Sequence, residues 1–150
     1  PFKVDYVDGY GIILNKKNFK NNFYYDDKMF LHLDSMDLCL RINRSGGSIY
    51  IVPESKIHHE GGKSVDPKYF KEVELSRNWH WIWSKYYYNK KNYGFIKAMT
   101  ECFPSFLSSI LKFFYYSVTN NSFKKKIYLN RALGFYNAFI GKPSWYRPKI

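Results

Sequence analysis

The sequence predicts an α/β domain that is followed by amphipathic helices. Two apolar runs with the length of buried strands, residues 11–15 and 48–52, flank a segment at 35–45 whose apolar residues recur at helical spacing. The last third of the chain has a helical pattern. These observations divide the chain into an α/β domain at 1–93 and a helical tail at 94–150.

The first half of the expected domain combines a strand, a turn and a helix. Residues 4–8 alternate apolar and polar side chains, and the Gly-Tyr-Gly sequence at 9–11 indicates a turn or a close approach of the backbone. The helix can be capped by Asp34 or Ser35, because both side chains can accept hydrogen bonds from free backbone N–H groups. The glycine pair at 46–47 is suited to end it.

The second half of the expected domain contains two strands and a long helix. The strand at 48–52 ends at a proline, and residues 56–58 resemble a short strand that leads to His59. The Asp-Pro pair at 66–67 is a typical helix start, since aspartate caps the helix and proline fits its first turn. This helix is expected to run to about residue 89.

The tail is expected to be helical, with breaks at Pro104 and at the Asn-Asn-Ser sequence 120–122. Its stretch 102–118 is mostly apolar but contains a proline, four serines and Lys112. Because about 20 apolar residues are needed to span a bilayer, an interfacial amphipathic segment is the better interpretation.

Composition and charge limit the classes of function. A chain of 150 residues with 45% apolar residues fits one domain, or part of one, and can bury a core. Its net charge is +12, and residues 94–150 hold nine Lys or Arg against one acid. Such a balance attracts lipid headgroups, nucleic acid or a phosphorylated substrate. Nucleic acid is not expected as a partner, because no reading motif is present and carboxylates at 26, 27, 34 and 37 repel phosphates.

Two cysteines are too few for a disulfide framework. Cys39 falls in the apolar pattern of the helix at 35–45, where a small core residue is expected. A reducing compartment is consistent with this composition.

Asp34 and Asp37 are candidate catalytic residues. They lie three residues apart at a helix start and therefore face roughly the same way. The positive end of the helix dipole keeps such carboxylates ionised, and an ionised carboxylate can remove a proton from an incoming hydroxyl. The spacing by itself is explained more simply if one of these aspartates caps the helix and the other is exposed to solvent.

His59 is a candidate metal or phosphate ligand. Adjacent residues of a strand point to opposite faces, so only one of His58 and His59 can face a site. The following sequence Gly-Gly-Lys-Ser at 61–64, which includes Lys63, resembles part of a phosphate loop but lacks the full Walker spacing. The alternative for His59 is a strand-end histidine bonded to the backbone.

Arg77 and three nearby tryptophans form a further candidate group. An arginine can hold a diphosphate through paired hydrogen bonds, and tryptophans can stack on sugar rings. For at least two of the tryptophans at 79, 81 and 83, packing in the protein interior is the expected role.

These motifs together resemble the second half of a family 2 glycosyltransferase, and most strongly the bacterial rhamnosyltransferase-like members that build surface polysaccharides. The resemblance covers about residues 3–93, and residues 129–143 more loosely. The stretches that carry it are VDYVDGYGIILNKKNF, FYYDDKMFLHLDSMDLCLRINRSGGSIYIVPESKIHHEGGKS, SRNWHWIWSKYY and LNRALGFYNAFIGKP.

The resemblance implies a GT-A (Rossmann-like) fold, of which this chain would be the C-terminal half. A preceding half would bind the nucleotide and supply an acidic metal-binding motif. The base would lie in the segment 34–37, and His59 matches the family histidine near the donor diphosphate and a divalent metal, Mg²⁺ or Mn²⁺. The residues expected to bind substrate are Gly9, Arg41, Lys63 and Arg77.

One position departs from the family pattern. The family usually has Glu-Asp, any residue and Asp, and the second of these residues is the base. Ser35 occupies that position here, and a serine hydroxyl is not basic near neutral pH. Asp34, which is adjacent, is the expected substitute, with Asp37 as the other candidate.

The expected function is an inverting sugar transfer from a nucleotide-sugar donor to a polysaccharide or lipid-linked acceptor in cell-surface glycan synthesis. The expected location is cytoplasmic, peripheral to the inner face of the cell membrane, with the tail on the membrane surface. The alternative is a binding module for a glycan or a nucleotide sugar in which Ser35 has ended catalysis.

Overall fold

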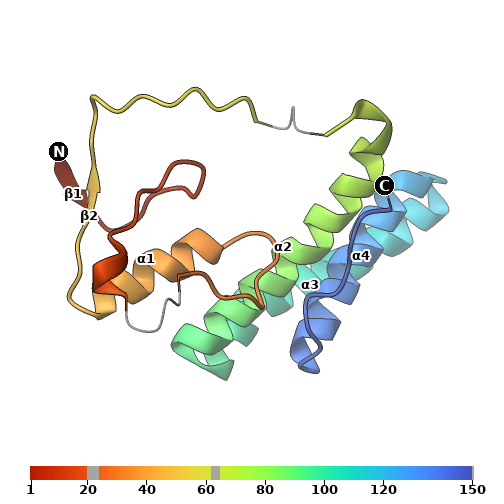
Figure 1. Ribbon diagram of the computed structural model, residues 1–150. Helices are drawn as coiled ribbons and strands as arrows, with labels where there is room; N and C mark the ends of the chain where they lie inside the picture. Colours follow the sequence, from red (N-terminus) through yellow and green to blue (C-terminus); the bar gives the residue numbers. More distant parts are fainter. Residues whose placement is uncertain (20–23, 62–64, 150) are drawn as a thin grey trace. The chain divides into compact units, whose positions relative to one another are not determined.

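The computed structural model describes residues 1–19, 24–61 and 65–149 (Figure 1). These residues form two compact units. The first, here called the N-terminal unit, comprises Pro1–Met29 and Leu33–Ser64. The second, the helical unit, comprises Phe30–His32 and Val65–Ile150.

The N-terminal unit contains one main helix and a small sheet. Helix α1 spans Asp34–Arg44, and the 3₁₀ turn η1 spans Lys16–Asn18. Strand β1 (Phe2–Val4) pairs with β2 (Ile49–Ile51) in antiparallel orientation, and Lys3 lies opposite Tyr50. Helix α1 contacts the segment that follows β1, because the Asn43 side-chain amide donates a hydrogen bond of 2.9 Å to the Asp5 carbonyl oxygen.

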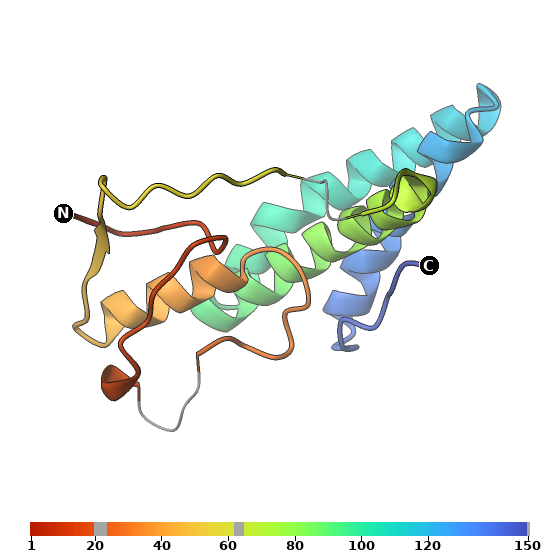
Figure 2. The ribbon, with the colours of Figure 1, turned by 45° about the horizontal axis from the view of Figure 1, so that its top comes forward.

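The helical unit is built from three long helices that pack against one another (Figures 1 and 2). They are α2 (Phe70–Tyr93), α3 (Phe95–Val118) and α4 (Ser122–Phe139), and the 3₁₀ turn η3 (Pro67–Tyr69) precedes α2. Asp66 caps this turn by accepting a hydrogen bond of 3.0 Å from the Lys68 backbone N–H. The predicted helix start at 66–67 is therefore confirmed.

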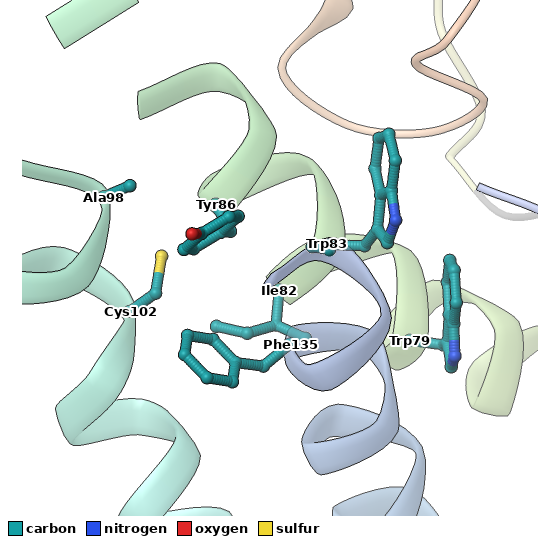
Figure 3. Close-up of a cluster of buried hydrophobic side chains, with 8 residues drawn as sticks. Trp79, Ile82, Trp83, Tyr86, Ala98, Cys102 and Phe135 are labelled. Atoms are coloured by element: carbon teal, nitrogen blue, oxygen red, sulfur yellow. The ribbon is translucent and has the colours of Figure 1, made fainter. Parts of the chain in front are cut away.

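The core of the helical unit is aromatic and draws on all three helices. Figure 3 shows Ile82 and Tyr86 of α2 facing Cys102 of α3 and Phe135 of α4. Trp79 and Trp83 are also buried in this cluster. The Trp83 indole N–H donates a hydrogen bond of 3.0 Å to the carbonyl oxygen of Lys142, so the segment after α4 is bound to α2 as well.

The predicted Rossmann-like α/β fold is wrong. Among the described residues, helices account for most of the regular structure, and the only sheet has two antiparallel strands. A Rossmann-like domain needs several parallel strands with helices on both faces. The runs 11–15 and 56–58, which were expected to be strands, pair with no neighbouring strand, and Ile13 is 98% exposed. A strand pattern becomes a strand only where another chain segment completes its hydrogen bonds.

The predicted helix break at Pro104 is also wrong, whereas the break at 120–122 is confirmed in position. Helix α3 continues through Pro104, which is exposed. Proline removes one backbone hydrogen bond from a helix, and packing on either side can hold the helix together across that loss. The turn between α3 and α4 contains Asn120 with φ 56°, a conformation that asparagine tolerates better than most residues.

Helix α2 packs with α3 and α4, so the two compact units divide the chain differently from the domains predicted at 1–93 and 94–150. The functional assignment of those domains, a catalytic half and a membrane-associated tail, remains a prediction. Within the described residues, none of the helices is sufficiently long and apolar to cross a membrane.

Candidate functional site

The start of α1 lies against the turn at residues 9–11. A Cβ atom on Gly9 would be 2.2 Å from the Ser35 Oγ atom. Real Cβ atoms essentially never approach another atom so closely, so this contact requires glycine or a shift of Ser35. Gly9, expected to bind substrate, is thereby placed beside the acidic segment 34–37.

The same turn contacts the segment that contains His59. The rings of Tyr10 and His59 are stacked, with centroids 4.9 Å apart and planes inclined by 2°. A Cβ atom on Gly11 would be 2.5 Å from the Cδ1 atom of Ile57. The three residues of the turn therefore contact both the first turn of α1 and the segment 57–59.

Asp37 is the more buried of the two candidate bases. It has no exposed surface, and its Oδ2 atom accepts a hydrogen bond of 2.9 Å from Nε of Arg41. Arg41 also donates from Nη2 to the carbonyl oxygen of Tyr24. The ion pair therefore joins α1 to the segment at residue 24, and Arg41, which was expected to bind substrate, makes these contacts within the protein.

Asp34 is half-buried in the first turn of α1. The free N–H groups of that turn create a partial positive charge that favours a carboxylate. The chain enters the helix through His32 and Leu33, whose φ angles are 65° and 63°. Such left-handed backbone costs a residue other than glycine about 1–2 kcal/mol. Strain of this kind is concentrated at functional sites, although it does not define one.

Two tyrosines near the acids were not identified from the sequence. Tyr6 donates a hydrogen bond of 2.6 Å to Oδ1 of Asp8, and this bond is the main reason that the pKa of Tyr6 is raised to about 12. Burial raises the pKa of Tyr25, and the negative charge of Asp34 adds to the effect. Both hydroxyls therefore keep their protons near neutral pH.

The remaining candidates lie elsewhere or outside the described residues. Arg77 is exposed on α2, in the helical unit. Lys63 lies outside the described residues. Trp79 and Trp83 are core residues, which confirms the packing expected for at least two of the three tryptophans. Trp81 is 43% exposed and contacts the ring of His32 edge to face.

A metal site was expected at His59. Within the described ranges, His, Cys, Asp and Glu side chains form no group of three or more that could hold a metal ion. His59 is exposed, and the contact that defines its position is the stacked ring of Tyr10. A single imidazole does not by itself make a site for Mg²⁺ or Mn²⁺, which prefer oxygen ligands, and the divalent metal at His59 remains a prediction.

Comparison with known proteins identifies no relative. No family model matches the chain, and no curated protein and no solved structure matches it.

Proposed function

We propose that the N-terminal unit contributes the acceptor side of an inverting sugar transferase, which moves a sugar from a nucleotide-sugar donor to a polysaccharide or lipid-linked acceptor. The proposal starts from the resemblance of the motifs to family 2 glycosyltransferases. The observation that carries it is the turn at 9–11, which contacts Ser35 through Gly9 and His59 through Tyr10. The acidic segment and the imidazole are thus linked by three residues.

Asp34 is the base in this proposal. A general base must reach the proton of the acceptor hydroxyl, so it needs a path to the substrate. Asp34 retains some exposure, whereas Asp37 has none and is bonded to Arg41. The deprotonated hydroxyl oxygen then attacks the anomeric carbon from the face opposite the leaving diphosphate, as inversion of configuration requires.

The departing diphosphate needs compensating positive charge, because charge develops on its oxygen in the transition state. The family resemblance gives Arg77 and Lys63 as the side chains for this role. Asp37 and Arg41 support the site by fixing α1 to the segment at residue 24.

The test is a measurement of sugar transfer by the full-length protein and its Asp34→Asn variant. The substitution removes the charge and the basicity but keeps the size of the side chain. We expect kcat to fall by about 10²–10⁴-fold, the usual contribution of a general base. The readout is the release of nucleoside diphosphate from a panel of nucleotide sugars in the presence of glycan acceptors.

Asp27→Asn is the matched control, because Asp27 is an exposed acid of the same unit. It should leave kcat unchanged, and both variants should unfold at the temperature of the wild-type protein. If Asp34→Asn transfers sugar at the wild-type rate, Asp34 is not the base.

A binding module without catalysis is the second candidate function. Ser35 favours it, because this residue stands where the family resemblance places the base and its side chain is buried against Gly9. Calorimetric binding of a nucleotide sugar without turnover, equal in the wild-type protein and in Asp34→Asn, would support this function over the first.

A further inference from the structure

Helix α3 is apolar on two opposite sides. One side enters the core through Ala98 and Cys102 and continues through the buried Ser109. The other side carries a row of exposed apolar residues, here called the outer stripe, whose exposed fractions run from 41% to 86%. Its members are Ile96, Phe103, Leu107, Leu111, Phe114 and Val118.

The outer stripe follows the period of the helix. Its members are separated by seven, four, four, three and four residues, which places them on one face of a helix with 3.6 residues per turn. Helix α3 has 24 residues and is therefore about 36 Å long at 1.5 Å per residue. Single exposed apolar side chains are ordinary, but six of them on one face of a helix mark a surface that binds another apolar body.

The end of the α3–α4 hairpin is strongly basic. Lys112 and Arg131 lie over the ring of Tyr128, with the charged groups 5.2 and 5.7 Å from the ring centroid. Lys124 lies 5.2 Å from the ring centroid of Tyr116. Cations and aromatic rings thus alternate over this end of the hairpin, and Figure 2 shows the turn between α3 and α4 at one end of the bundle.

Acidic residues do not offset this charge. The sequence contains no Asp or Glu after Glu101. Glu101 itself lies near the beginning of α3, where its carboxylate pairs with Lys97 at 2.9 Å and with Lys85 at 3.3 Å. The part of the helical unit beyond Glu101 therefore combines the outer stripe with uncompensated positive charge.

The outer stripe and the uncompensated positive charge together indicate which kind of partner binds this unit. An apolar row on a unit with uncompensated positive charge is complementary to a bilayer whose headgroups are anionic. A second copy of this chain fits less well, because each copy carries +12 and the contact would bring like charges together. No described helix is able to cross a bilayer, which leaves an orientation along the surface.

We propose that α3 docks on an anionic membrane. The helix lies in the plane of the interface, the outer stripe enters the boundary between headgroups and acyl chains, and the positive charge of the hairpin attracts the anionic headgroups. This surface is in the helical unit and does not depend on whether the N-terminal unit transfers sugar.

The experiment is vesicle flotation of the full-length protein. Vesicles of phosphatidylcholine with phosphatidylglycerol are compared with vesicles of phosphatidylcholine alone, each at low and at high salt. We expect the protein to float with the anionic vesicles, to float much less with the neutral ones, and to be released in part by salt because exposed charges are screened.

Two variants test the two parts of the surface, and each has a matched control. Leu107→Gln with Leu111→Gln should weaken binding by at least about tenfold, because two exposed leucines no longer enter the apolar layer. The control Val52→Gln with Ile57→Gln removes two exposed aliphatic side chains of the N-terminal unit and should bind as the wild type does.

For the charge, Lys124, Lys125 and Lys126 are changed together to Gln and compared with Lys3, Lys16 and Lys17 changed to Gln. Both triple variants lower the net charge by three, but only the first should lose binding to anionic vesicles.

Absence of flotation, or flotation that is equal in all variants, overturns the proposal. Self-association that is abolished by the Leu107 and Leu111 substitutions, without vesicle binding, would instead identify a second copy as the partner.

Discussion

His80 illustrates how burial alters the chemistry of one side chain. It is fully buried on α2, and its Nε2 atom lies 2.7 Å from the carbonyl oxygen of Tyr146. Because a carbonyl oxygen only accepts hydrogen bonds, Nε2 carries the proton of the neutral ring. Burial lowers the pKa of His80 to about 4, and the positive charge of Arg147 contributes in the same direction.

This shift predicts a loss of stability in mild acid. In the unfolded chain the imidazole binds a proton below about pH 6.5, whereas in the folded protein it does so only below about pH 4. The unfolded state therefore binds more protons between these values, and the free energy of unfolding falls as the pH is lowered from 6.5 to 4. The difference between the two pKa values corresponds to about 3 kcal/mol as an upper bound.

Urea unfolding across this pH range measures the effect. His80→Gln should flatten the pH dependence even if it lowers stability at neutral pH, while His58→Gln, at a histidine whose side chain is 86% exposed, should retain it. An unchanged pH dependence in His80→Gln would show that other groups cause the acid sensitivity.

The two acids at the start of α1 also differ at the residue scale. Asp34 was the preferred base and Asp37 the other candidate, and the ion pair between Asp37 and Arg41 assigns Asp37 to the interior of the N-terminal unit. A spacing of four residues on one helix permits such a pair, but Arg41 was expected to bind substrate. The burial of Asp37 was not predicted, because burial depends on which segments cover the helix.

Helix α2 is the central element of the helical unit. Its buried residues are distributed around the helix instead of forming one stripe, because α3 and α4 pack on it and the segment after α4 covers it further. Trp79 stacks against Tyr146 of that segment, with ring centroids 5.9 Å apart. The Ser84 hydroxyl donates a hydrogen bond of 2.6 Å to the Leu31 carbonyl oxygen.

The contact between α2 and α4 is closest at Gly134. A Cβ atom at this position would lie 2.3 Å from the backbone carbonyl oxygen of Trp79 and 2.8 Å from Cγ2 of Ile82. The first neighbour is backbone, so the helices themselves would have to move apart. This close approach explains a glycine inside a helix, where glycine otherwise costs about 1 kcal/mol relative to alanine.

Gly134→Ala should therefore destabilise the protein although alanine is the better helix former. We expect a loss of about 1–3 kcal/mol, the usual cost of overpacking a core. Thermal unfolding followed by circular dichroism measures it. Gly61→Ala is the matched control, since no atom in the described part of the chain lies within 4 Å of its added Cβ. Equal unfolding temperatures for both variants would contradict the close packing of α2 and α4.

At the scale of the whole molecule, the two compact units have cores of different size. Among the described residues of the N-terminal unit, the buried apolar side chains are those of Met29, Leu38, Cys39 and Ile49. The helical unit buries a larger set, which includes Trp79, Trp83, Tyr86 and Phe135. Since apolar burial is the main favourable contribution to folding, the helical unit is expected to be the more stable of the two.

Hydrogen exchange tests this difference. We expect the backbone amides of α1 to exchange at least about tenfold faster than those in the middle of α2, because smaller cores open at lower free energy. Exchange at native pH, read peptide by peptide by mass spectrometry, provides the comparison. Equal protection of α1 and the middle of α2 would show that both units open in one cooperative step.

The helices were largely predictable because helix formation depends on neighbours in the chain. The spacing at 35–45 and the Asp-Pro pair at 66–67 led to α1 and α2 within a few residues. Strands are different, since a partner segment far along the chain must complete their hydrogen bonds. This requirement explains why the run 48–52 became β2, paired with β1, while 11–15 did not become a strand.

The sequence by itself determined the positive charge, the helical C-terminal part, the aromatic content of the core and the motifs that suggest sugar transfer. The tertiary structure alone decided that Gly9 and Tyr10 link Ser35 to His59, that Asp37 is buried, and which side of α3 remains exposed. The physical reason is that composition and helical period are local properties. Burial and contact belong to pairs of segments that only the folded chain brings together.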